Sequence, residues 1–96
     1  MLVKVRYKGT PEMNEKTIAI IGGCGHVGLP LGVKLALAGF RTTLIDINES
    51  AVKRVNSGHF PFVERGGDEQ LSMALKRGLE ATTDIKECAQ ADVIVF

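Results

Sequence analysis

Apolar residues cluster in short runs separated by glycine-containing turns and amphipathic stretches. Ile18–Ile21 and Asp92–Phe96 carry nearly continuous apolar runs, which are typical of strands buried on both faces. Thr42–Ile45 and Leu79–Thr82 predict two further short strands. Leu2–Tyr7 alternates apolar and basic residues, and this period of two predicts a half-buried strand ahead of the others.

Helices are predicted between these strands. Residues 26–38 are apolar at nearly every position, so we expect a mostly buried helix that ends at a Gly39 cap. Asn48 is placed to cap a short amphipathic helix that stops near Gly58. Two further helices are predicted at 68–77 and 83–88.

This order of elements predicts an α/β fold, with a parallel sheet, right-handed crossovers and the strand order 3-2-1-4. A doubly wound sheet normally continues for two more strands. We therefore expect residues 17–96 to be a partial domain, truncated after its fourth strand, and residues 1–16 to be an N-terminal strand and linker. The fourth strand would then have a bare edge, and bare edges recruit other strands. We expect Leu2–Tyr7 or a second copy of the chain to cover it.

Composition excludes several classes of function. The 96 residues are 45% apolar and 24% charged with a net charge of +1, which is ordinary for one small globular domain. A dedicated nucleic-acid surface needs clustered positive charge, and a membrane span needs about 18 consecutive apolar residues. The sequence has neither, and no signal peptide is recognisable. Cys24 and Cys88 are too few for a disulfide framework or a metal site, so we expect a reduced, cytoplasmic protein.

One motif points to chemistry. Gly23-Cys24-Gly25-His26-Val27-Gly28 matches G-x-G-x-x-G, follows a buried strand and opens a helix, as in the dinucleotide-binding turn of Rossmann-type domains. Gly23 would allow the tight turn, Gly25 would let a diphosphate reach the backbone, and Gly28 would let helix and strand pack closely. The amides of His26 and Val27 would then point at the phosphates with the helix dipole behind them.

An acidic residue follows the fingerprint at the spacing that a dinucleotide site requires. Asp46 ends the second predicted strand, where a carboxylate can accept hydrogen bonds from both hydroxyls of the adenosine ribose. No arginine follows it, so a 2′-phosphate would meet uncompensated negative charge, and NAD is favoured over NADP. The alternative is a helix-capping role for Asp46. We do not expect the His26 side chain to be a general base, because its position faces the diphosphate or a loop and is remote from the nicotinamide. Nor do we expect Cys24 to be a nucleophile, because it occupies a variable position of the fingerprint.

Beyond the glycines, the sequence resembles the UDP-glucose/GDP-mannose dehydrogenase family. The run 18–31, with Gly-His-Val-Gly-Leu-Pro at its centre, is similar to that family's first strand and helix, and Asp46-Ile47-Asn48 to the end of its second strand. Residues 57–64 resemble its N-x-G-x-x-P-x-x-E loop, and 81–84 and 91–95 also match. The chain departs from the family at His26, where tyrosine is frequent, and at Arg65-Gly66, where Pro-Gly is usual.

The resemblance implies a cofactor site and a role in a larger enzyme. The family oxidises the C6 hydroxyl of a nucleotide sugar to a carboxylate with NAD, which makes NAD and a nucleotide sugar the expected ligands. Its catalytic cysteine and lysine lie beyond the part that corresponds to residue 96, so this chain is expected to hold no catalytic residue, to bind no metal and to be inactive alone.

Two other classes share the fingerprint and the acidic residue. NAD-sensing regulatory domains of ion transporters pass rapidly from the second helix to the third strand, whereas this chain inserts a loop and a helix at residues 59–78. β-Hydroxyacid dehydrogenases more often carry a basic residue after the second strand and lack the proline–glutamate loop. Both features favour the nucleotide-sugar dehydrogenases.

Overall fold

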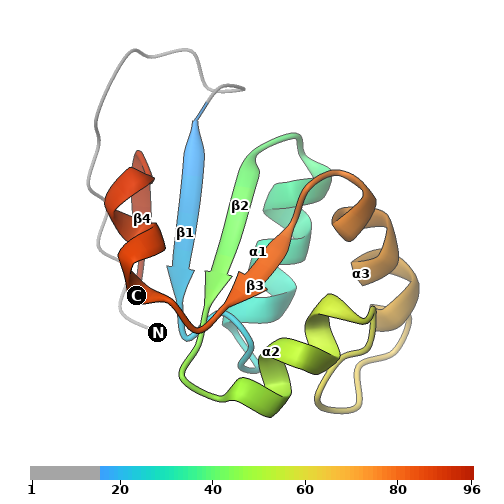
Figure 1. Cartoon of the computed structure of the whole chain (residues 1–96). Coiled ribbons are helices and arrows are strands. Elements are labelled where there is room, and N and C mark those ends of the chain that lie inside the picture. The colour runs from blue at the N-terminus through green and yellow to red at the C-terminus, as the bar shows by residue number, and fades with distance from the viewer. Residues whose placement is uncertain (1–15) are drawn as a thin grey trace.

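The computed structural model describes residues 16–96, which form a parallel sheet with helices packed on it (Figure 1). The predicted strand and linker in residues 1–15 lie outside the described residues. In chain order the elements are β1 (Thr17–Ile21), α1 (Gly28–Leu37), β2 (Arg41–Ile45), α2 (Glu49–Asn56), α3 (Gly67–Lys76), β3 (Glu80–Thr82), the 3-10 helix η2 (Ile85–Gln90) and β4 (Val93–Val95).

The strands pair in the order β3-β2-β1-β4, and every pair is parallel. This confirms the predicted α/β fold and its order. Ile20 of the central strand β1 lies opposite Leu44 on one side and Val95 on the other. Since the strands are parallel, β1 and β2 end at the same edge of the sheet, where their connections to α1 and α2 lie side by side.

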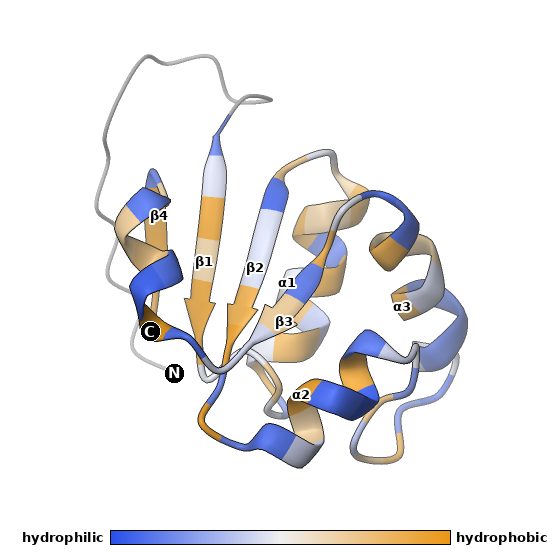
Figure 2. Ribbon diagram, in the orientation of Figure 1, coloured by the Kyte–Doolittle hydropathy of each residue, from blue (hydrophilic) through white to orange (hydrophobic). Residues whose placement is uncertain are grey.

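Alternate residues of the strands face two apolar layers. Ile18, Ile20 and Leu44 belong to the larger cluster, which also holds the buried residues of α1, α2 and α3. Ala19 and Ile45 face the opposite side, where they pack with Ala91 next to η2. The apolar colouring of β1 in Figure 2 follows from this burial on both faces. A fully buried aliphatic side chain such as Ile20 contributes about 1.5–3 kcal/mol.

The outer edge of β3 is closed by a side chain. The Asn56 amide nitrogen donates to the Ala81 carbonyl at 2.8 Å, and the Ala81 amide donates to the Asn56 side-chain oxygen at 2.9 Å. One asparagine at the end of α2 therefore replaces a neighbouring strand at this point, which protects the edge from further pairing. Covering of the β4 edge by Leu2–Tyr7 or by a second copy stays a prediction.

The predicted helix boundaries need small corrections. α1 begins at Gly28 rather than at residue 26, because the two preceding residues remain in the turn after β1. Its end is as predicted: Gly39 adopts a left-handed φ of +104°, and the Phe40 amide donates back to the Leu35 carbonyl. The last short helix is a 3-10 helix that Asp84 caps through the Lys86 amide. Within residues 16–96, no helix has the length and apolar character needed to cross a bilayer.

Candidate functional site

The connection between β1 and α1 is a glycine-rich turn that is hydrogen-bonded to the end of β2. Gly22, just before the fingerprint, adopts a left-handed φ of +74°. The amides of Gly22 and Gly23 both donate to the Ile45 carbonyl, at 2.8 and 3.1 Å. The sharp reversal was predicted at Gly23, but Gly22 supplies the unusual backbone angle.

The three fingerprint glycines do not have the same reason to be glycine. A β-carbon on Gly23 would lie 2.7 Å from the Leu44 Cβ, and one on Gly28 would lie 2.6 Å from the Gly22 carbonyl oxygen. Packing within the chain therefore forbids a side chain at both positions. A β-carbon on Gly25 would meet only the Gly22 oxygen, at an ordinary 3.4 Å. Its missing side chain is not required by the fold and leaves space in front of the turn.

Gly28 and Gly32, one turn apart on α1, form a stripe of small residues that meets two different partners. A β-carbon on Gly32 would overlap Leu44 Cδ2 and lie 3.3 Å from Ile20 Cδ1, so this glycine packs against the sheet. Gly28 instead meets the backbone of the turn. The stripe thus sets both the distance between helix and sheet and the position of the turn above β1.

The amides of His26 and Val27 are available for a ligand. Among the described residues, neither donates to an acceptor of the chain, and the first helical bond of α1 runs from the Leu29 amide to the Gly25 carbonyl. No side chain caps α1, and its first turn holds no acidic residue. Free donors at the positive end of a helix dipole attract an anion.

Asp46 lies beside this turn, half-buried at the end of β2. Its Oδ2 accepts from the Cys24 amide at 3.1 Å, and its Oδ1 accepts from the Asn48 amide at 3.0 Å. Each carboxylate oxygen can accept a second hydrogen bond, so acceptors remain for two hydroxyls. Asp46 does not cap α2, because Asn48 does so by accepting from the Ala51 amide.

The two reactive side chains of the fingerprint are both engaged in structure. Burial of the Cys24 thiol, and next the nearby Asp46 charge, raise the pKa of Cys24 to about 12. A thiol with that pKa stays protonated near neutral pH and is a poor nucleophile. The His26 ring stacks on Phe62, with centroids 4.0 Å apart and an interplanar angle of 16°. His26 therefore faces the loop after α2.

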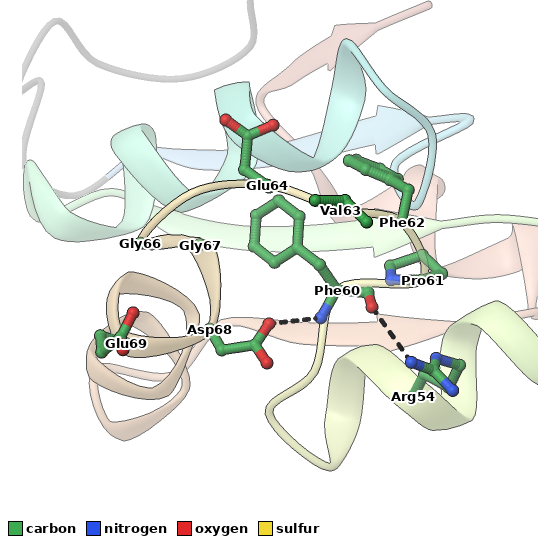
Figure 3. Close-up of a pocket in the computed structure, with 10 residues that line it drawn as sticks. All are labelled: Arg54, Phe60, Pro61, Phe62, Val63, Glu64, Gly66, Gly67, Asp68 and Glu69. Atoms are coloured by element: carbon green, nitrogen blue, oxygen red, sulfur yellow. Dashed lines mark hydrogen bonds between the residues drawn. The ribbon is translucent and has the colours of Figure 1, made fainter.

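That loop, residues 59–66, is held at its base. Figure 3 shows Phe60 between two partners: its amide donates to Asp68 Oδ1 at 2.9 Å, and its carbonyl accepts from Arg54 at 3.4 Å. The Phe60 hydrogen bond, followed by that with His59, lowers the pKa of Asp68. The loop and the start of α3 border a hollow of about 570 Å³, whose lining includes Phe62 but no fingerprint residue.

The geometry thus brings together the six residues that the sequence singled out, at one edge of the sheet. These are Gly23, Gly25, His26, Val27, Gly28 and Asp46. Sequence reasoning missed two contacts, the hydrogen bond from Cys24 to Asp46 and the stack of His26 on Phe62, because each joins residues far apart in the chain. An aromatic-rich loop, Phe60-Pro61-Phe62, was the available signal. Residues 16–96 contain no cluster of histidine, cysteine or acidic side chains able to hold a metal.

Comparisons with known proteins show the family of the chain. Residues 16–96 match the model of the UDP-glucose/GDP-mannose dehydrogenase family, NAD binding domain. An uncharacterized protein of Methanocaldococcus jannaschii, MJ1054, is 42% identical over 80% of this chain and 8% of its own length. UDP-glucose 6-dehydrogenase TuaD of Bacillus subtilis is 34% identical over 84% of this chain and 18% of its own length.

A solved structure, that of UDP-D-ManNAc dehydrogenase from Pyrococcus horikoshii, superposes on 81% of this chain and 19% of its own, with a TM-score of 0.77 and 29% identity. The chain thus spans less than a fifth of the length of these relatives. The family match covers all of the described residues, and it includes the fingerprint, Asp46 and the loop after α2. The chain belongs to the UDP-glucose/GDP-mannose dehydrogenase family, in which it corresponds to the NAD-binding domain, and its cofactor is NAD.

Proposed function

We propose that the edge of the sheet beyond β1 and β2 binds the ADP half of NAD, and that it does so as part of a nucleotide-sugar 6-dehydrogenase. One observation carries the proposal: the free amides of His26 and Val27 lie beside an open Gly25 and a half-buried Asp46 with spare acceptor capacity. Donors for a diphosphate and acceptors for a ribose diol are thus adjacent.

Each residue fits one part of the cofactor. The amides of His26 and Val27 would hold the diphosphate, Gly25 would leave room for it, and Asp46 would orient the ribose. When bound, NAD supplies a hydride acceptor for oxidation of an alcohol. In this role the residues of this chain bind and orient the cofactor.

The wider assignments rest on the family. We propose that the substrate is a nucleotide sugar oxidised at C6, supported by relatives such as the B. subtilis UDP-glucose 6-dehydrogenase. We also propose that residues 17–96 alone are inactive, since they contribute the cofactor site only, and that the protein works in the reducing cytoplasm, consistent with free Cys24 and Cys88. NADH formation by the purified chain from a UDP-hexose would contradict the proposed inactivity.

The test of the cofactor site is its preference for NAD over NADP. A 2′-phosphate would replace a hydroxyl donor and lie roughly 3–4 Å from the Asp46 carboxylate, with a repulsion of roughly 1–4 kcal/mol per charge pair. Because each 1.4 kcal/mol corresponds to a factor of ten, we expect a preference of about tenfold or more. Calorimetric titration of the chain with both dinucleotides measures it.

Three variants separate charge from shape. Asp46→Asn keeps an acceptor oxygen but removes the charge, so it should weaken NAD binding and bring the two affinities together. Asp46→Ser with Ile47→Arg should reverse the preference, because Ile47 is 97% exposed and an arginine there displaces no packing. Ile47→Arg alone is the control for the added charge. Equal affinities in the unsubstituted chain would mean that Asp46 serves the turn and not a ribose.

A further inference from the structure

We propose that Phe62 is a positioning residue of the dinucleotide site. Its ring, stacked on His26, would hold the glycine turn in the conformation that presents the His26 and Val27 amides to a diphosphate. This inference rests on the proposed function, and it assigns to the loop after α2 a role in cofactor binding that its distance in sequence from the fingerprint conceals.

The turn has few side chains with which to fix its own shape. Residues 22–28 contain four glycines, and of the three other residues Cys24 is buried behind the turn while Val27 is 57% exposed. Hydrogen bonds from Gly22 and Gly23 anchor the first half of the turn to β2. The second half, which carries the free amides, has the His26 ring as its side-chain contact with another segment. That contact is therefore the restraint nearest to the donors.

The stack is close and nearly parallel. The two ring centroids lie 4.0 Å apart at an interplanar angle of 16°. Because the ring and one of the two amides belong to the same residue, fixing the ring limits rotation of the backbone that carries the donor. Aromatic pairs of this kind change an equilibrium by about twofold to tenfold.

Phe62 itself is supported from below. Its ring meets the edge of Phe60 at a centroid distance of 5.3 Å and an angle of 87°. Phe60 is only 6% exposed, and Asp68 and Arg54 hold its backbone on both sides. Figure 3 shows this base, with Phe62 and Phe60 on the same loop above the start of α3. A path of contacts thus runs from Asp68 through the two phenylalanines to His26.

The neighbouring residue provides a matched control. Val63 is fully exposed and follows Phe62 directly, so Val63→Ala changes the same loop without touching the stack. Phe62→Ala removes the ring, Phe62→Leu keeps most of the apolar volume without an aromatic face, and Phe62→Tyr keeps the stack. His26→Ala removes the other partner, and its combination with Phe62→Ala closes a double-mutant cycle.

The experiment titrates the whole chain and these variants with ADP and, separately, with adenosine, following amide signals by NMR. We expect Phe62→Ala and Phe62→Leu to weaken ADP binding by about twofold to tenfold and to leave adenosine binding within about twofold. Phe62→Tyr and Val63→Ala should bind both probes as the unsubstituted chain does. The double variant should lose little more ADP affinity than either single one.

Two results overturn the inference while leaving the proposed function intact. One is unchanged ADP affinity in a folded Phe62→Leu variant. The other is equal weakening of ADP and adenosine, which would assign Phe62 a structural role only. If the unsubstituted chain binds neither probe, the proposed function fails and this inference fails with it.

Discussion

The two strand-to-helix connections at the binding edge are built alike but end differently. Both leave a parallel strand and enter a helix on the same face of the sheet (Figure 1). α2 begins with an Asn48 cap whose side chain accepts from the Ala51 amide, and Glu49 occupies its first turn. α1 begins at Gly28 with no side-chain cap and no acidic residue in its first turn. One helix start is closed by the chain, and the other is open.

This difference shows how a repeated βα unit acquires a binding site. An N-terminal turn has unsatisfied amides in every helix, and side chains usually satisfy some of them. α3 also lacks a side-chain cap, but Asp68 and Glu69 place two negative charges in its first turn. Of these three helices, α1 alone has neither a side-chain cap nor an acidic residue in its first turn, which leaves its amides best suited to an external anion. The proposed site therefore depends on the lack of a capping or acidic side chain at the start of α1 as well as on the fingerprint and Asp46.

The largest expected effect is a difference in stability between substitutions at Gly28, which is close-packed, and at Gly25, which has space beside it. Gly28→Val would drive a side chain into the Gly22 carbonyl and the Gly23 Cα, which are backbone atoms and cannot move aside cheaply. Overpacking of this kind costs about 1–3 kcal/mol of unfolding free energy. The free energy of unfolding of Gly25→Ala should lie within about 0.5 kcal/mol of that of the unsubstituted chain, but the variant should bind NAD more weakly. Urea unfolding and NAD titration of both variants check this. Equal stability of the two variants would show that the turn is not close-packed.

An acidic side chain at the start of α1 should weaken NAD binding. Val27→Asp gives α1 a capping carboxylate like that of a typical helix, and Val27 is exposed enough to change without a packing loss. The new charge would repel the diphosphate by about 1.4 kcal/mol or more, so NAD affinity should fall at least about tenfold. The melting temperature should hold or rise, because the cap stabilises the helix. Unchanged NAD affinity would place the diphosphate elsewhere.

Removal of the Asn48 cap of α2 should lower the stability of the fold without weakening NAD binding. Asn48→Ala removes the oxygen that accepts from the Ala51 amide, and loss of such a cap costs about 1 kcal/mol. NAD affinity should stay within about twofold, because Asp46 receives only the backbone amide of residue 48. Chemical denaturation reports the first quantity and calorimetry the second. A binding loss larger than the stability loss would contradict the division between the two helix starts.

The smallest expected effect is a pH dependence of stability that arises from Asp68 at the start of α3. The hydrogen bond from Phe60, followed by that with His59, lowers the pKa of Asp68 from 3.8. The contribution of Asp68 to stability is therefore complete above pH 3.8 and is lost as the pH falls through the lower value in the folded state. Unfolding curves of the unsubstituted chain and of Asp68→Asn should differ at pH 6 and converge as the pH is lowered further and further below 3.8. A constant difference would mean that the carboxylate is not responsible.

Much of the fold follows from local patterns. The apolar run of β1, the Gly39 cap and the Asn48 cap each depend on neighbouring residues, so periodicity and capping rules find them. The strand order follows from the same pattern together with the handedness of crossovers. Predicted helix boundaries differ from the observed ones by one or two residues, as at the start of α1, because hydrogen bonding alone decides whether residues 26 and 27 are helical.

The site was less predictable than the fold. The fingerprint and Asp46 identify which residues gather, but not that Asp46 holds the turn through the Cys24 amide. The stack of His26 on Phe62 likewise depends on how the loop after α2 folds over α1. Such contacts depend on three-dimensional proximity between segments more than 20 residues apart, which no local pattern specifies.

The open start of α1 is tested most directly by following the backbone amides of the chain by ¹H–¹⁵N NMR during titration with NAD. We expect the largest shifts at His26 and Val27, smaller shifts near Asp46 and little change at Ala51, whose amide is already satisfied by Asn48. Largest shifts at the start of α2 or α3, with His26 and Val27 unmoved, would contradict this expectation.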